Sequence, residues 1–288
     1  MGTAEGTAQM SRRDEVLVST DWVAEHADDP AFRPVEVDED TAAYEGGHIR
    51  NAIAWHWKDD LHDELRREFL SQDALTELLR RSGIGPDTTV VLYGGNNNWF
   101  ATYAYWLLRY LGFDRVKLMD GGRKKWELEE RELVTDVPSV SPAEPGALDG
   151  IRDGLRAFRD DVLAHIGGPG RSMVDVRSPG EYSGEVMAPP HLPQEQAQVP
   201  GHIPGAANVP WASAARDDGS FKSDDELVAL YGGVGVTPDT DVIAYCRIGE
   251  RSSHTWFVLH EILGYERVRN YDGSWTEYGS LVGVPVER

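Results

Sequence analysis

The chain repeats itself, and this repeat constrains its fold more than any other feature of the sequence. Pro86-Asp87-Thr88 recurs as Pro238-Asp239-Thr240, and Asp120-Gly121-Gly122 recurs, with one change, as Asp272-Gly273-Ser274. The spacing is constant, since 238 − 86 and 272 − 120 both give 152. A repeat of this length indicates two duplicated domains and excludes the shorter units of a solenoid. The 288 residues are enough for two domains of ordinary size.

Each half alternates short β-prone runs with helical patterns. The sequence predicts strands over 35–37, 90–93, 173–176, 242–245 and 267–271, and helices over 73–81, 99–111, 224–231 and 253–263. Ser223 is a plausible N-cap for the third of these helices, and Gly264 follows the last. This alternation predicts an α/β fold in which each half is a mainly parallel sheet with helices on both faces.

Composition suggests where the halves begin and end. We expect a disordered tail over residues 1–13, a first domain over 14–137, a Pro/Ser-rich linker over 138–151 and a second domain over 152–288. A Pro-rich stretch over 188–196 is expected to be a surface loop of the second half.

The single cysteine, Cys246, lies where the pattern predicts a strand, a tight loop and a helix in succession. The N–H groups of Ile248, Gly249 and Glu250 would converge there on one spot and favour negative charge. Arg247 and Arg251 add positive charge, so we expect a thiolate with a lowered pKa. The alternative is a small buried hydrophobe, but such a residue needs neither the arginines nor the glycine.

Composition excludes several classes of function. One cysteine allows neither an internal disulfide nor a multi-thiolate metal site, and the histidines show no metal-ligand spacing, so we expect no metal or cofactor. The net charge of −21 disfavours nucleic acid and anionic membranes as partners. The N-terminus has no apolar core typical of a secretory signal, and the sequence contains no run long enough to cross a membrane, so a cytoplasmic protein is expected.

These motifs together resemble the two-domain rhodanese family, the thiosulfate sulfurtransferases and their mercaptopyruvate-using relatives. The resemblance rests on the duplicated halves, on Gly-His-Ile at 47–49 and again at 201–203, and on the segment 245–253. It implies two tandem rhodanese-like domains and an enzyme that holds a sulfane sulfur as a persulfide on Cys246. The implied partners are a small anionic sulfur donor and a thiophilic acceptor such as cyanide or a thiol, and we expect a monomer.

The resemblance also implies roles for single residues. Cys246 would be the nucleophile, and the loop amides would stabilise thiolate and persulfide. Arg247 and Arg251 would hold the donor's sulfonate oxygens. Ser274 would lend its hydroxyl to the persulfide. We expect Asp175 and Arg177 to form an ion pair that braces the loop rather than to contact substrate.

Two acidic residues depart from what a low thiolate pKa and an anionic donor require. Glu181 stands where some family members carry a second basic residue, so anchoring of the donor would rest more on the loop arginines. Glu250 lies inside the loop, and we expect its side chain to point to solvent.

The remaining candidates have structural interpretations. Gly94 occupies the position of Cys246 in the first half, so that half is expected to be non-catalytic and to enclose the active site. The aromatic helix over 99–106 is one candidate for the enclosing surface, and the alternative is that it is a simple core helix. His202 is expected to organise a turn. His254, near the start of the helix predicted over 253–263, is a candidate for proton handling.

Three other functions compete with thiosulfate sulfur transfer. 3-Mercaptopyruvate is an alternative donor, although two arginines suit a dianion better. A cysteine phosphatase would need five residues between cysteine and arginine, and this loop has only those from Arg247 to Glu250. A non-catalytic sulfur-carrier or binding module would not need the complete loop around Cys246.

Overall fold

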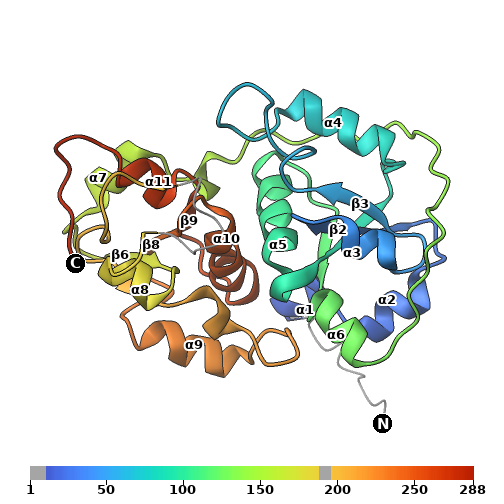
Figure 1. Ribbon diagram of the computed structural model, residues 1–288. Helices are drawn as coiled ribbons and strands as arrows, with labels where there is room; N and C mark the ends of the chain where they lie inside the picture. The colour runs from blue at the N-terminus through green and yellow to red at the C-terminus, as the bar shows by residue number, and fades with distance from the viewer. Residues whose placement is uncertain (1–10, 188–195) are drawn as a thin grey trace, which may run out of the picture.

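Two lobes of parallel sheet and helices make up the computed structural model, which describes residues 11–187 and 196–288 (Figure 1). The first half contains α1 (Arg12–Val16), β1 (Leu17–Val18), α2 (Thr20–His26), β2 (Phe32–Asp38), α3 (Ala42–Gly46), β3 (Ile53–His56), α4 (Gln72–Arg81), β4 (Thr89–Tyr93), α5 (Gly95–Tyr110), β5 (Val116–Met119) and α6 (Gly122–Leu128). The second contains η1 (Asp153–Leu155), α7 (Arg159–His165), β6 (Arg171–Asp175), α8 (Pro179–Ser183), β7 (Ala207–Asn208), η2 (Trp211–Ala214), α9 (Asp224–Gly232), β8 (Asp241–Tyr245), α10 (Glu250–Trp256), η3 (Phe257–Ile262), β9 (Val268–Tyr271) and α11 (Ser274–Tyr278).

The two sheets have the same strand order. The first is β1-β5-β4-β2-β3 and the second is β7-β6-β8-β9, and every strand pair in both is parallel. Apart from the additional edge strand β1, the orders β3-β2-β4-β5 and β7-β6-β8-β9 correspond strand by strand. The predicted α/β fold of two tandem domains is confirmed.

Buried residues on the central strands alternate between two cores. In β4, Val90 and Leu92 belong to one hydrophobic cluster, whereas Val91 and Tyr93 belong to another that includes Trp126 of α6. This period of two is what a strand with helices on both faces requires.

One of these cores is shared by both halves. Helices α5 and α10 lie side by side between the two sheets (Figure 1), and their buried residues join a single cluster with Leu92 of the first sheet and Val242 of the second. The rings of Tyr105 and Phe257 meet edge to face at 4.7 Å. Trp106 donates from Nε1 to the carbonyl of Leu155 in the second half at 3.0 Å. The two domains are therefore joined through a common core.

The predicted first and last residues of the helices agree with the structure in some cases and differ in others. Ser223 caps α9 as expected by accepting from the N–H of Glu226. In α5 the residues Asn96–Asn98 have left-handed φ values, so the regular helix starts at the predicted Trp99. The helix predicted over 253–263 begins earlier, at Glu250, and continues as the π-helix η3.

The histidines of the repeated Gly-His-Ile motif have equivalent positions in both halves. His48 donates from Nδ1 to the carbonyl of Tyr44, and its ring stacks on the ring of Tyr44 with the centroids 3.8 Å apart. His202 makes the same pair of contacts with Tyr182, with the rings 3.6 Å apart. Both imidazoles therefore organise a turn, as the sequence suggested for His202.

The chain ends and connections differ somewhat from expectation. Of the predicted tail over 1–13, residues 1–10 lie outside the described residues, as do 188–195 of the predicted surface loop. At the last tail positions the prediction is wrong, because α1 begins at Arg12 and Arg13 pairs with Asp224 of the second half at 2.8 Å. Residues 138–151 contain no helix or strand and run over the outside of the first half, where Gln72 donates to the carbonyl of Asp149.

Candidate active site

Cys246 directly follows the central strand β8 and opens the loop that ends at α10. Its side chain is fully buried. The loop turns at Gly249, whose φ of +100° is left-handed. A Cβ at this glycine would lie 2.5 Å from the Cα of Asp272, so no larger residue fits without moving one of the two segments.

Backbone donors and a cation act on the thiol of Cys246. Burial works to raise the pKa of this thiol, but the charge of Arg251 and the N–H groups of Ser252, Gly249 and Ile248 outweigh it and hold the pKa below its usual value. The N–H of Gly249 donates to Sγ at 3.1 Å. The loop therefore favours the thiolate, which is the nucleophilic form of cysteine.

Arg251 is held by Glu181, a contact that the sequence pattern did not predict. Its Nη1 and Nη2 donate to the two carboxylate oxygens of Glu181 at 3.0 and 2.9 Å. Although burial acts to raise the pKa of Glu181, Arg251 and Ser178 lower it to about 2. Both side chains are buried, so Arg251 acts on the thiol from within the protein and is not an open cationic clamp.

Arg247 is also buried, with 4% of its surface exposed. Its carbonyl accepts from the N–H of Thr276, which links the loop to α11. The two arginines expected to anchor a donor anion are thus both enclosed.

Glu250 does not point to solvent, contrary to expectation. It is 2% exposed and lines a cavity between the two halves. The reason is tertiary, because a segment of the first half covers this end of α10, and no pattern around Glu250 itself reveals that cover.

The hydroxyl of Ser274 lies at the backbone of the cysteine. Its Oγ accepts from the N–H of Cys246 at 3.0 Å and donates to the carbonyl of Tyr271 at 2.6 Å. The hydroxyl proton of Ser274 is thus donated to a backbone carbonyl, and its oxygen fixes the backbone of Cys246 at the junction between β8 and the loop.

Asp175 and Arg177 form the expected ion pair, with Nη2 and Oδ2 2.6 Å apart and both side chains buried. Arg177 also donates to the carbonyl of Gly201 at 2.7 Å, and its guanidinium lies 4.8 Å from the ring centre of Trp275. The pair ties the end of β6 to α11, beside the loop.

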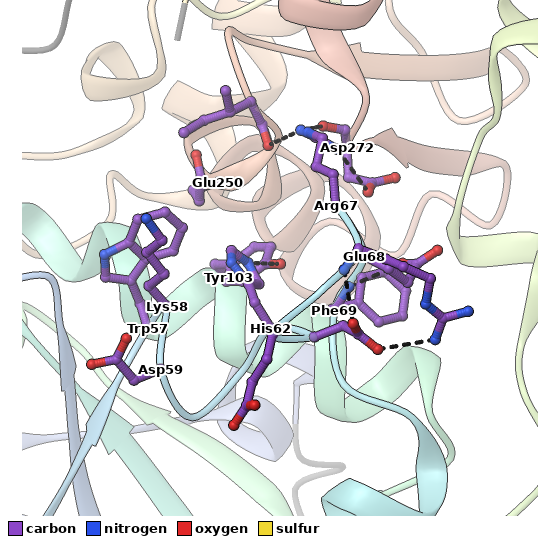
Figure 2. Close-up of a pocket in the computed structure, with 14 residues that line it drawn as sticks. Trp57, Lys58, Asp59, His62, Arg67, Glu68, Phe69, Tyr103, Glu250 and Asp272 are labelled. Atoms are coloured by element: carbon purple, nitrogen blue, oxygen red, sulfur yellow. Dashed lines mark hydrogen bonds and ion pairs between the residues drawn. The ribbon is translucent and has the colours of Figure 1, made fainter. Parts of the chain in front are cut away.

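A cavity of about 390 Å³ lies over the loop, between the two halves. The first half contributes Trp57, Lys58, His62 and Arg67 from one segment, with Tyr103 from α5; the second contributes Ile248, Glu250 and Asp272 (Figure 2). Of the aromatic helix expected to wall the site, Tyr103 faces this cavity, while Tyr105 and Trp106 are buried in the shared core.

The segment over 57–69 was missed by sequence reasoning, because it has neither a motif nor a periodic pattern. Within it, His62 contacts the hydroxyl of Tyr103 through Nε2 at 2.8 Å. Burial is the main reason that the pKa of His62 falls to about 4, so its imidazole is neutral at pH 7.

His254 lies in α10 among the rings of Trp211 and Phe221. It is fully buried, and burial lowers its pKa to about 3. Among the residues that the structure describes, neither of its ring nitrogens has a hydrogen-bond partner. This environment suits a neutral core residue better than a proton carrier.

Within residues 11–187 and 196–288, no group of three or more His, Cys, Asp and Glu side chains is arranged to hold a metal ion. Over the same ranges, none of the helices combines the length and apolar character needed to span a bilayer.

Comparisons with known proteins agree with this architecture. The family model described as "Rhodanese-like domain" matches twice, over residues 19–129 and 158–281. A protein of Saccharopolyspora erythraea named "Putative thiosulfate sulfurtransferase" is 57% identical over 280 residues, which cover 96% of this chain and 97% of that protein. The "Sulfur carrier protein TtuD" of Thermus thermophilus is 54% identical, over 95% of this chain and 97% of its own.

A solved structure supports the fold alone. The anaerobic ergothioneine biosynthesis enzyme of Chlorobium limicola, in complex with trimethyl histidine, superposes with a TM-score of 0.83 at 22% identity and covers 97% of this chain and 71% of that one. Since the family model matches both halves and close relatives align over nearly the whole chain, this protein belongs to the rhodanese-like family, with two such domains in tandem.

Proposed function

We propose that this protein is a sulfurtransferase that moves a sulfane sulfur from thiosulfate to a thiophilic acceptor through a persulfide on Cys246. The observation that carries the proposal is the thiol itself, whose pKa is lowered and whose sulfur accepts from the Gly249 N–H at 3.1 Å. The names of the close relatives support sulfur transfer or sulfur carriage as the general chemistry.

Two displacements at sulfur make up the proposed cycle. The Cys246 thiolate attacks the outer sulfur of thiosulfate, the S–S bond of the donor breaks, and sulfite leaves with the electron pair. Cyanide or an acceptor thiolate then attacks the outer sulfur of the persulfide and regenerates the Cys246 thiolate. The loop amides stabilise the negative sulfur in both steps, because they are already oriented before reaction.

The buried arginines have different proposed roles from those first expected. Arg251 stabilises the thiolate through space, since both of its terminal nitrogens already donate to Glu181. The same pairing weakens the case for a dianionic donor, and it therefore favours 3-mercaptopyruvate as a second candidate.

We expect the protein to act as a monomer.

Intact-mass spectrometry tests the mechanism and ranks the donors. Incubation with the true donor should add about 32 Da, one sulfur atom, on Cys246, and cyanide should remove it. Thiosulfate and 3-mercaptopyruvate are compared at equal concentration. If neither donor adds mass, the persulfide mechanism is wrong and a non-catalytic binding module becomes the better interpretation.

Replacement of the nucleophile gives a direct prediction. Cys246→Ser should lose sulfur transfer by more than about 10³-fold, because loss of a sole nucleophile has effects of this size. The fold should survive, as judged by circular dichroism, because the two side chains are similar in size. Residual transfer above about 1% of wild type would contradict a persulfide on this residue.

A further inference from the structure

Successive carbonyl groups of the active-site loop point away from the sulfur of Cys246, toward donors outside the loop. The carbonyl of Cys246 accepts from the N–H of Trp275, and that of Arg247 accepts from the N–H of Thr276, both at 3.0 Å. These two donors belong to α11 of the same half. The next carbonyl, that of Ile248, is contacted from the other half of the molecule.

The contact to Ile248 comes from Arg67, in the segment of the first half that covers the loop (Figure 2). Its Nη2 donates to the carbonyl of Ile248 at 3.3 Å and to the carbonyl of Asp272 at 2.9 Å. One guanidinium nitrogen thus joins the loop to the segment that packs against Gly249. No expectation from the sequence singled out this arginine.

Peptide geometry links this contact to the sulfur. The carbonyl of Ile248 and the N–H of Gly249 belong to one planar trans peptide and point in opposite directions. The carbonyl points to Arg67, and the N–H donates to Sγ of Cys246. A cation at the carbonyl end also polarises the peptide, which makes its N–H a stronger donor.

The neighbours of Arg67 keep it in place. Its Nη1 lies 3.8 Å from Oδ2 of Asp272, which is itself bound by Arg156. Arg156 also pairs with Glu68, the residue next to Arg67, at 2.9 Å. The segment is therefore fixed to the second half at Arg67 and at the residue that follows it, although more than half of the Arg67 side chain is exposed.

We propose that Arg67, contributed by the half that has no cysteine, is a positioning residue that orients the Ile248–Gly249 peptide so that its N–H faces the sulfur of Cys246. This inference rests on the proposed function in taking Cys246 as the nucleophile. It gives the non-catalytic half a part in the chemistry beyond enclosing the site.

The test measures ionisation of the thiol, without any sulfur donor. Thiolate absorbance in the ultraviolet is followed against pH, and Cys246→Ser serves as the blank because the chain has one cysteine. In Arg67→Ala the pH of half-ionisation should rise by roughly 0.5–1, because one of the donors to the thiolate loses its fixed orientation. Arg67→Lys should recover part of the difference, since an ammonium can still donate to these carbonyls.

Arg66→Ala is the matched control. Arg66 lines the same cavity and is more exposed, and it pairs with Asp63 rather than with a loop carbonyl. Its loss removes the same charge and should leave the titration unchanged. The effect of Arg67→Ala should also persist at about 0.5 M salt, where a long-range charge effect would be screened.

Two results would overturn the proposal: a titration of Arg67→Ala that coincides with that of wild type, or an equal shift in Arg66→Ala. Thermal unfolding of each variant verifies that the fold is retained. Failure of the proposed function is a separate result, because it would appear as a wild-type protein that gains no mass from either donor while its thiol titrates normally.

Discussion

At the scale of single residues, Glu181 and Arg251 set the charge beside the thiol. Their contact is bidentate and buried, which is the geometry in which a carboxylate and a guanidinium interact most strongly. An unpaired positive charge at this place would attract anions but would cost much more to bury. Glu181 therefore lowers the free-energy cost of burying the charge of Arg251. The pairing does not cancel the electrostatic effect of Arg251 on the thiol of Cys246.

Glu181→Gln tests this balance. Without the carboxylate, Arg251 favours the thiolate more strongly, so the pH at which Cys246 ionises should fall. The variant also leaves a buried charge without its partner, which should lower the free energy of unfolding by about 3–5 kcal/mol at pH 7. Thiolate absorbance and denaturant unfolding measure the two effects, with the exposed Glu185→Gln as control.

The pH dependence has a defined sign. The pKa of Glu181 is lowered to about 2 in the folded protein from its ordinary value of 4.5. A carboxyl with a depressed folded pKa adds stability above its unfolded pKa and loses it as the pH falls toward the folded one. The stability difference between wild type and Glu181→Gln should therefore shrink between pH 4.5 and 2. A difference that stays constant over this window would contradict the ion pair.

Contacts between residues close together in the sequence could be predicted, whereas contacts between distant segments could not. The cysteine, the loop glycine and the ion pair of Asp175 with Arg177 follow from local patterns. Glu181 looked like a departure from the family because its partner is 70 residues away along the chain. Glu250 was wrongly expected in solvent, and Arg67 was missed, because both depend on contacts between the halves.

At the scale of elements, the turn between β8 and α10 requires a residue with no side chain. Gly249 combines a left-handed φ with close approach to the backbone of Asp272. Either condition alone favours glycine, and together they leave no room for a Cβ. Strand, turn and helix thus hold the N–H of this residue at the sulfur.

Gly249→Ala should reduce sulfur transfer by about 10²-fold or more, because a displacement of about 1 Å at a catalytic group has this effect. Gly235→Ala is the matched control, since it has a similar φ of +81° and open space around its Cα. The control should lose only about 1 kcal/mol of stability and keep its activity. Equal activity of the two variants in a transfer assay would show that the close approach to Asp272 is unimportant.

Element type was easier to predict than element ends. Strands and helices follow from the period of buried residues, and the strands expected at 90–93 and 242–245 are present as β4 and β8. The early start of α10 follows from the turn at Gly249, and the chain then continues as the π-helix η3, which no sequence pattern predicted. The segment over 57–69 contains no helix or strand beyond an isolated antiparallel bridge between His62 and Phe69, so only the tertiary fold reveals that it covers the site.

At the scale of the whole molecule, the net charge of −21 opposes an anionic donor. If thiosulfate is the donor, its kcat/KM should rise as salt increases from about 10 to 150 mM, because the screening length falls from about 30 to 8 Å. The rate with a neutral acceptor thiol should change little over the same range. A fall in kcat/KM with salt would instead mean that local cations such as Lys58 and Arg67 dominate the approach of the donor.

The core shared by α5 and α10 means that the peptide link between the halves is not what holds them together. A chain cleaved within residues 138–151 should give two fragments that stay associated as a non-covalent complex, because Trp106 and Trp256 would otherwise be exposed to water. Gel filtration of the co-expressed fragments would reveal this, and elution as two separate species would contradict it. Neither fragment should transfer sulfur alone, because the catalytic loop lies in the second half and the segment that covers it lies in the first. Regained activity would therefore report association of the two fragments, and this fold could serve as a split reporter whose signal is the restored cover of its catalytic loop.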